Sequence, residues 1–183
     1  MEFVELTEQE FNNFGLNNEY GNFHQTSNWG KLKEKNGWKS HLIGVKEDGE
    51  IKAACLLLQK CVLKKFSLFY SPRGYLLDYN DYSKLKSMTN LIKRFLKKRN
   101  VVAIKICPSL VRNIYDIKGD VIYTNPDYLK CFNNFRKLEY RHLGYNNGFE
   151  ALKPRFEAYI DLKEKPIEEL FKGIKKEYRT KIR

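Results

Sequence analysis

The chain has 183 residues, of which 42% are hydrophobic and 14% aromatic, so it is long and apolar enough to fold around one sizeable core. Its formal net charge of +12, from 34 basic against 22 acidic residues, predicts anionic partners such as nucleic acid, phosphorylated metabolites or an acidic membrane surface. The composition excludes an intrinsically disordered chain, and no apolar run is long enough to span a membrane.

The first residues and the cysteines bear on the compartment. Residues 1–5 lack the basic start and apolar core of a signal peptide, which predicts a cytoplasmic protein. The four cysteines show no CxxC spacing and mostly lie inside apolar runs: Cys55, Cys61, Cys107 and Cys131. We therefore expect buried free thiols rather than zinc ligands or disulfides.

A short strand at residues 3–6 and a helix are predicted first, because Thr7 and Glu10 have the spacing of a capping box. The helix is expected to end near residue 14, and an Asn- and Gly-rich loop follows at residues 17–28.

A second short helix is expected after this loop, capped by Ser27 or Asn28. It carries Trp29, which we expect to be a core anchor like Trp38, because aromatic side chains bury large areas.

Three antiparallel strands in a meander are predicted next. The dipeptide at residues 48–49, Asp-Gly, is the strongest hairpin signal in the chain, and strands at 40–46 and 51–62 flank it. A third strand is expected at residues 66–70.

The third strand runs into Ser-Pro-Arg-Gly, which is the plainest candidate for a site. Pro72 cannot donate to a ladder, so strand pairing is expected to end there and to deliver Arg73 into a turn. Gly74 allows a bend or the close approach of a ligand, and the guanidinium fork of Arg73 suits phosphate or carboxylate. The alternative is a surface arginine in an ordinary loop.

The middle of the chain predicts a parallel crossover. A helix is expected from Asp81 or Ser83 to about residue 98, with apolar residues at intervals of three and four. Residues 101–106 form a β-branched run closed by Pro108, which is typical of an interior strand. The order strand, helix, strand predicts a parallel pair with a right-handed crossover.

The last third is expected to contain two helices and a strand. Residues 116–126 are less regular; Asp127 is then expected to cap a helix that continues to about residue 143 and ends at Gly144. Residues 155–162 alternate as a strand, and Pro166 opens one final helix.

That final helix holds a cluster of basic residues and no stop signal, so we expect that the sequence stops partway through a larger protein. The residues from 154 onward are too few to form a core alone and must pack on the preceding domain or on a second copy.

Several stretches, in order, are similar to motifs of the Fem family of non-ribosomal peptidyltransferases. The similar stretches are His24–Lys33 (Q-S-x-x-W-x-x-x-K), Tyr70–Asp78 (Y-x-P-R-G-P-x-x-D), Ile104–Pro108 (I-K-I-D-P), Leu143–Tyr145, Pro154–Arg155 with Ile160–Leu162, and Lys175–Arg183 (K-T-R-x-N-I-R). No single motif is specific, but the ordered series covers nearly the whole chain.

The resemblance implies a mixed-sheet α/β fold of two acetyltransferase (GNAT)-like domains. Residues 1–153 would be the first domain, and residues 154–183 the opening strand and helix of a second, whose remainder is missing. It also implies transfer of an amino acid from aminoacyl-tRNA to the stem peptide of a peptidoglycan precursor, lipid-linked or UDP-linked, with peripheral contact to the inner membrane face. No cofactor is implied, and the catalytic residues stay unknown.

The resemblance also implies a cleft on the first domain that binds the acceptor's diphosphate and sugar. The matching substrate-binding positions are Lys31, Lys33, Tyr70, Arg73, Cys107 and Arg179. Cys107 stands where the family has an aspartate, and a thiol does not replace a charged acceptor at neutral pH unless its pKa is strongly depressed. Tyr75 replaces the usual proline. Acceptor recognition is therefore expected to differ.

Two other functions stay open from the residues. An acetyl-CoA-dependent N-acetyltransferase fits the expected fold, although its glycine-rich pyrophosphate loop is not visible. A basic RNA-binding module without catalysis fits the charge. For Lys31 and Lys33, a solvated helix face is the competing interpretation.

Overall fold

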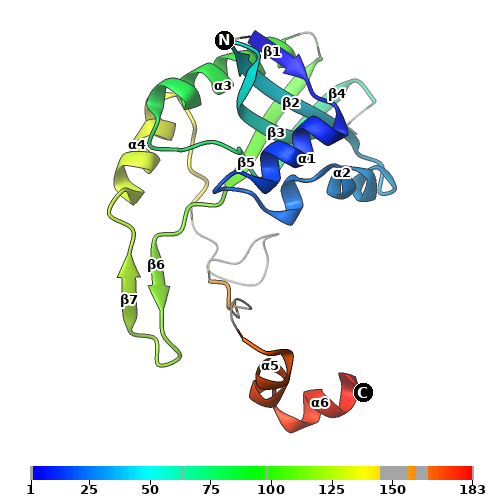
Figure 1. Ribbon diagram of the computed structural model, residues 1–183. Coiled ribbons are helices and arrows are strands. Elements are labelled where there is room, and N and C mark those ends of the chain that lie inside the picture. Colours follow the sequence, from blue (N-terminus) through cyan, green and yellow to red (C-terminus); the bar gives the residue numbers. More distant parts are fainter. Residues whose placement is uncertain (1, 63, 98, 145–155, 160–164, 183) are drawn as a thin grey trace. The chain divides into compact units, whose positions relative to one another are not determined.

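The computed structural model describes the chain except residues 1, 63, 98, 145–155, 160–164 and 183 (Figure 1). The chain divides into two compact units, Met1–Arg141 and His142–Arg183. The domain boundary predicted between residues 153 and 154 lies outside the described residues.

The first unit is built on a five-stranded mixed sheet in the order β1-β2-β3-β4-β5. Its strands are β1 (Glu2–Glu5), β2 (Lys39–Glu47), β3 (Glu50–Val62), β4 (Phe66–Arg73) and β5 (Val101–Pro108). The predicted meander is confirmed, and β1 extends it by pairing with β2. Asp48 and Gly49 form the β2–β3 turn with φ of 53° and 79°, the left-handed pair that a tight hairpin turn requires.

β4 is longer than predicted. Its pairing with β3 ends where Tyr70 faces Leu58, but its parallel pairing with β5 continues to Arg73. The N–H and C=O of a strand residue point to the same side, and the C=O of Pro72 points toward β3, where the Gln25 amide binds it. The missing N–H of Pro72 therefore interrupts only the β3 side.

The parallel pairing of β4 and β5 confirms the predicted crossover pair, but the interior position predicted for this strand is wrong. Within the part of the chain that the structure describes, β5 is an edge strand, and Val102 is 63% exposed. A β-branched run indicates strand propensity, whereas the position of the strand in the sheet depends on which distant segments pair with it.

Helices cover both faces of the sheet, as Figure 1 shows. Alternate residues of β3 point to opposite faces: Ala53, Cys55 and Leu57 pack with α3 (Tyr82–Leu96) and α4 (Tyr128–Lys137). Ala54, Leu56 and Leu58 pack instead with α1 (Glu8–Leu16) and its surroundings.

The caps of α1 and α3 are as predicted. Thr7 and Glu10 form the reciprocal capping box, and Asp81 accepts from the Lys84 N–H at 2.9 Å. Thr26, not Ser27 or Asn28, caps α2 (Ser27–Glu34), because Ser27 is engaged by Asn12 through two hydrogen bonds of 2.8 and 2.9 Å.

Two parts of the region from 113 to 144 differ from the prediction. The irregular stretch is a hairpin of β6 (Asn113–Tyr115) and β7 (Val121–Thr124). α4 ends at Lys137 rather than near residue 143, because Glu139 adopts a left-handed φ of 67° and the Tyr140 N–H turns back to the Phe135 carbonyl.

The second unit holds α5 (Ile167–Gly173) and α6 (Lys176–Ile182). The prediction of a single final helix is wrong, because Ile174 is extended, with ψ of 137°, and separates α5 from α6. Of the strand predicted at 155–162, only residues 156–159 are described, and they are not in a strand.

The predicted burial of the thiols holds for Cys55 and Cys131, whereas Cys61 is exposed and Cys107 partly exposed. None of the helices that the structure describes has the length and apolar character needed to cross a membrane.

Candidate functional site

The site is built where β3 and β4 separate. Past the Leu58–Tyr70 pair, the Gln25 side chain lies between the strands in place of a direct ladder bond. Its Oε1 accepts from the Leu56 N–H at 2.8 Å, and its Nε2 donates to the Pro72 carbonyl at 2.6 Å. Gln25 is 1% exposed, so both backbone groups would be buried without partners if the amide were absent.

The residues after Pro72 fit closely around this amide. A Cβ on Gly74 would lie 2.4 Å from Ser71 Oγ and 2.7 Å from Gln25 Nε2. Gly74 is therefore needed for close packing within the protein, whereas the sequence had also suggested the approach of a ligand. Arg73, immediately before it, has a left-handed φ of 51°, and its carbonyl accepts from Asn22 Nδ2 at 3.2 Å.

An aromatic group lies on the segment that supplies Gln25 and Asn22. In η1 (Phe23–Gln25), the Phe23 and His24 rings are 3.8 Å apart between centroids, and the His24 ring is 4.6 Å from that of Trp29. Lys33 Nζ lies 4.8 Å from the centroid of the Trp29 ring. Phe23 is 65% exposed, so this group forms surface beside the end of β4.

The predicted lysines differ in their surroundings. Lys33 contacts the aromatic group through Trp29, whereas Lys31 pairs with Glu8 of α1 at 2.6 Å. The side chains of Lys31 and Glu8 are more than half exposed, which makes this a weak surface pair. Contacts therefore link Lys33, but not Lys31, to the segment that holds Arg73.

Tyr70, Arg73 and Cys107 gather at the carboxyl ends of the parallel pair. Tyr70 faces Lys105 across the ladder, and Cys107 is the partner of Pro72. Burial raises the pKa of Tyr70 to about 12, the Cys107 thiol adds to this rise, and the Arg73 guanidinium opposes it. Tyr70 is therefore a neutral hydrogen-bond donor at pH 7.

The remaining predicted position, Arg179, lies on α6 in the second unit. It is partly exposed there and is described within that unit only.

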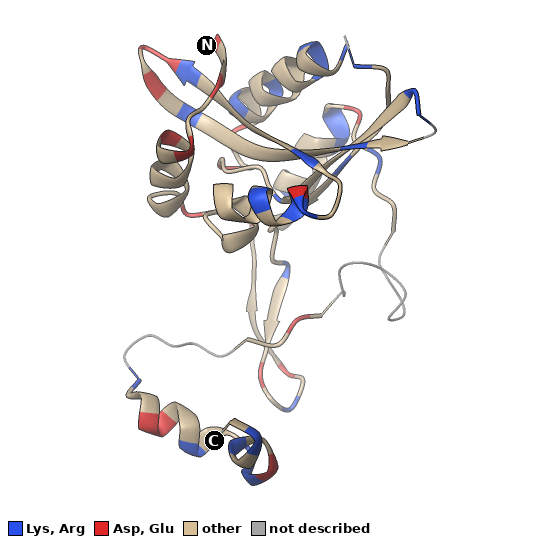
Figure 2. Cartoon of the chain, turned by 90° about the vertical axis from the view of Figure 1, so that its right-hand side faces the viewer, with Lys and Arg blue, Asp and Glu red and all other residues tan. Residues whose placement is uncertain are grey.

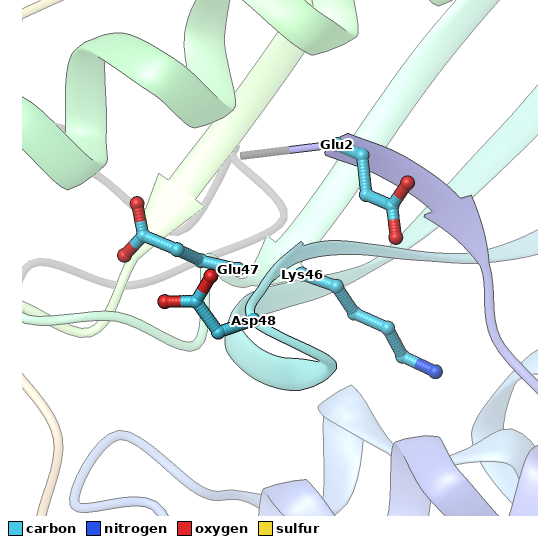
Figure 3. A pocket seen from close by; sticks show the side chains of 4 residues that line it. All are labelled: Glu2, Lys46, Glu47 and Asp48. Carbon is cyan, nitrogen blue, oxygen red and sulfur yellow. The ribbon is translucent and has the colours of Figure 1, made fainter.

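A shallow hollow elsewhere in the first unit does not fit an anionic ligand. It is lined by Glu2, Lys46, Glu47 and Asp48, and the carboxylates of Glu47 and Asp48 point away from Lys46 (Figure 3). Lys46 already pairs with Glu10 at 2.8 Å. Three carboxylates around one engaged lysine repel phosphate.

The residues that sequence reasoning missed as site-forming are Gln25, Asn22 and Phe23. In the sequence, Gln25 is marked only by its place in the stretch His24–Lys33 that is similar to a Fem motif. Part of the chemical signal was present, because a proline in an inner strand lacks a ladder donor and interrupts pairing on one side, so backbone groups there require a side chain as partner.

The comparisons with known proteins agree with the predicted resemblance. A family model described as "FemAB family" matches residues 6–183. The chain is 31% identical over 188 residues to aminoacyltransferase FemA of Staphylococcus epidermidis and, over the same length, to that of Staphylococcus aureus. It is covered completely in both alignments but spans only 45% and 44% of these relatives.

A solved structure shows the same fold. The crystal structure of FemX matches the whole chain with a TM-score of 0.71 and 26% sequence identity, and the chain covers 42% of it. This likeness includes the mixed α/β architecture described above. The family model spans both units, and on that basis the chain belongs to the FemAB family.

Proposed function

We propose that the whole protein, of which this chain is a part, is an aminoacyltransferase. It moves an amino acid from aminoacyl-tRNA to the stem peptide of a peptidoglycan precursor, lipid-linked or UDP-linked. Family membership and relatives named aminoacyltransferase FemA support this. The proposed reaction takes place in the cytoplasm, with peripheral contact to the inner membrane face, because its two substrates are found in the cytoplasm and at that face. The fold would be two GNAT-like domains, residues 1–153 and the second beginning at residue 154.

The observation that carries the proposal for this chain is the conformation and place of Arg73. It ends β4 beside the end of β5, and ligands of mixed α/β sheets bind where parallel strands present their carboxyl ends. A left-handed φ costs a non-glycine residue on the order of 1 kcal/mol or more. A glycine would avoid this cost, so the arginine side chain supports a function for the guanidinium.

The proposed acceptor site combines three kinds of donor. Arg73 supplies a guanidinium, Lys33 an ammonium and Tyr70 a neutral hydroxyl, which together suit a diphosphate and an attached sugar. The resemblance alone assigns Lys31 to this site and gives Arg179, which lies in the second unit, a role in substrate binding. Cys107, partly exposed beside Pro72, offers a thiol where a carboxylate would accept hydrogen bonds, which supports a different acceptor preference.

Magnitudes indicate that this part of the protein binds acceptor weakly by itself. Hydrogen bonds to charged groups contribute about 1.5–3 kcal/mol each. Two or three to a diphosphate give roughly 3–9 kcal/mol, against an association cost of roughly 4–15 kcal/mol.

A transfer assay with aminoacyl-tRNA and a peptidoglycan precursor tests the proposal. The whole protein is expected to turn over, whereas this chain alone is expected to be inactive. Turnover with acetyl-CoA in place of aminoacyl-tRNA would contradict the proposal and favour an N-acetyltransferase.

The site itself is tested by binding of a UDP-linked precursor to the whole protein. Arg73→Ala and Lys33→Ala are expected to weaken binding about tenfold or more each, which corresponds to the loss of one charged hydrogen bond. The melting temperature should stay nearly constant. Lys35→Ala, on the same segment as Lys33 and exposed, is the matched control. Equal affinity of Arg73→Ala and the unmodified protein would remove Arg73 from the site.

A further inference from the structure

The positive charge of this chain is concentrated in two segments. Residues 51–77 contain five basic and no acidic residues, and residues 82–115 contain nine basic and no acidic residues. The rest of the chain has 20 basic and 22 acidic residues, so these two segments account for the whole net positive charge. They form most of β3, all of β4, α3, β5 and β6, and the β3–β4 and α3–β5 connections; Asp78 and Asp81, in the β4–α3 connection, lie between the two segments.

Two connections from these segments meet at one end of the sheet. The β3–β4 turn carries Lys64 and Lys65, and the α3–β5 connection carries Lys97 and Arg99. The Ser67 N–H donates to the Asn100 carbonyl at 2.9 Å, which holds the two connections side by side. We call this surface the distal basic end and define it by Lys64, Lys65, Lys97 and Arg99; Figure 2 shows basic colour at the turn.

The three lysines of the distal basic end, Lys64, Lys65 and Lys97, are available for a ligand. In the described parts of the chain, the lysines that form ion pairs with acidic residues all lie outside the distal basic end. Arg99 lies 3.6 Å from the centroid of the Phe95 ring and donates to the Phe95 carbonyl, which fixes its guanidinium. Phe66, next to Lys65, is 43% exposed and offers a ring on which a base can stack.

This surface is separate from the proposed acceptor site. Phe66 begins β4 and Arg73 ends it, so the two ends lie roughly 23 Å apart at about 3.3 Å per residue. The diphosphate of a lipid-linked acceptor sits at the membrane surface, so a membrane would approach the Arg73 end. An anionic membrane is therefore not the partner that the distal basic end favours.

We infer that the distal basic end binds the phosphate backbone of RNA, and that under the proposed function, on which this identification rests, the RNA is the body of the donor tRNA. Lysines on two adjacent connections neutralise phosphates without reading bases, so binding is independent of sequence and strongly dependent on salt. The exposed ring of Phe66 adds stacking with an unpaired base.

The test compares two triple variants of this chain in filter binding across a salt series. Lys64, Lys65 and Lys97 are changed to Gln in one, leaving Arg99 in its structural contacts. Lys86, Lys118 and Lys130, also exposed, are changed to Gln in the control, which loses the same charge. The probes are deacylated bulk tRNA and an RNA hairpin of unrelated sequence.

The slope of log K against log salt is expected to fall by about 2–3 in the first variant, roughly 0.9 per lost phosphate contact. Each lost contact should weaken RNA binding by the first variant about eightfold more at 0.1 M salt than at 1 M salt. The control variant should keep the slope of the unmodified chain. Equal slopes for all three proteins, or equal losses in both variants, would overturn the inference.

Vesicles containing phosphatidylglycerol are the second probe. Loss of vesicle binding in the first variant with unchanged tRNA binding would also overturn the inference and assign the surface to a membrane. Because deacylated tRNA binding requires no transfer, failure here leaves the Arg73 site untested and intact. An inactive whole protein that still shows the expected slopes would instead contradict only the proposed function.

Discussion

Replacing Gln25 tests whether one buried amide joins the two halves of the sheet. Gln25→Ala removes the hydrogen-bond partner of the Leu56 N–H and of the Pro72 carbonyl. Both groups contact Gln25, which is itself only 1% exposed, so they lie in the packed interior. Each orphaned buried group costs about 1–3 kcal/mol, so the free energy of unfolding should fall by roughly 2–6 kcal/mol. For a chain of this length that corresponds to a melting temperature lower by roughly 4–24 °C.

The assay is urea and thermal unfolding followed by circular dichroism. Gln9→Ala, an exposed glutamine on α1, is the matched control and should change stability by less than about 0.5 kcal/mol. If Gln25→Ala unfolds with the same midpoint as Gln9→Ala, the Leu56 N–H and the Pro72 carbonyl do not depend on the Gln25 amide for a partner.

Gln25→Glu separates the loss of a donor from the loss of volume. The carboxylate can still accept from Leu56 but faces the Pro72 carbonyl without a proton, and burial raises its folded pKa. A protonated acid can donate to Pro72, so this variant should approach the stability of the unmodified protein as pH falls from 7 toward 4. A stability difference that does not change with pH would contradict the bridging geometry.

Two further predictions concern Gly74 and Glu10. Gly74→Ala should lower the free energy of unfolding by about 1–3 kcal/mol, because its Cβ overlaps Ser71 and Gln25; Gly173→Ala, with open space around the added atom, is the control in the same unfolding assay. The hydrogen bond from Lys46, and to a smaller extent those from Thr7, lower the pKa of Glu10 from 4.5 to about 2. The Glu10 carboxylate therefore stabilises the folded protein above pH 4.5, and this stabilisation disappears as pH falls toward 2. Glu10→Gln should therefore be less stable than the unmodified protein at pH 7 and equally stable near pH 2, and a constant difference over that range would refute the assignment.

Elements whose signals lie within a few residues of each other could be predicted from the amino-acid sequence. Three such signals are the Thr7–Glu10 capping box, the Asp48–Gly49 turn and the apolar spacing of α3. Each predicts its element because the residues that form the signal are adjacent or three to four positions apart. The Pro-Arg-Gly bend was predicted from a local signal of the same kind, since the missing N–H of Pro72 interrupts pairing on the side toward β3. Family membership likewise followed from ordered motifs.

Features that depend on residues distant in the chain could not be predicted and became visible in the folded structure. Asn12 binds Ser27, so Thr26 caps α2. The Gln25 side chain connects β3 and β4 through Leu56 and Pro72, which are 31 and 47 residues away in the sequence. The edge position of β5 depends on which segments pair with it, and β-branched residues suit edge and interior strands alike. Local propensity is fixed by neighbouring residues, whereas pairing and burial depend on which segments the folded chain brings together.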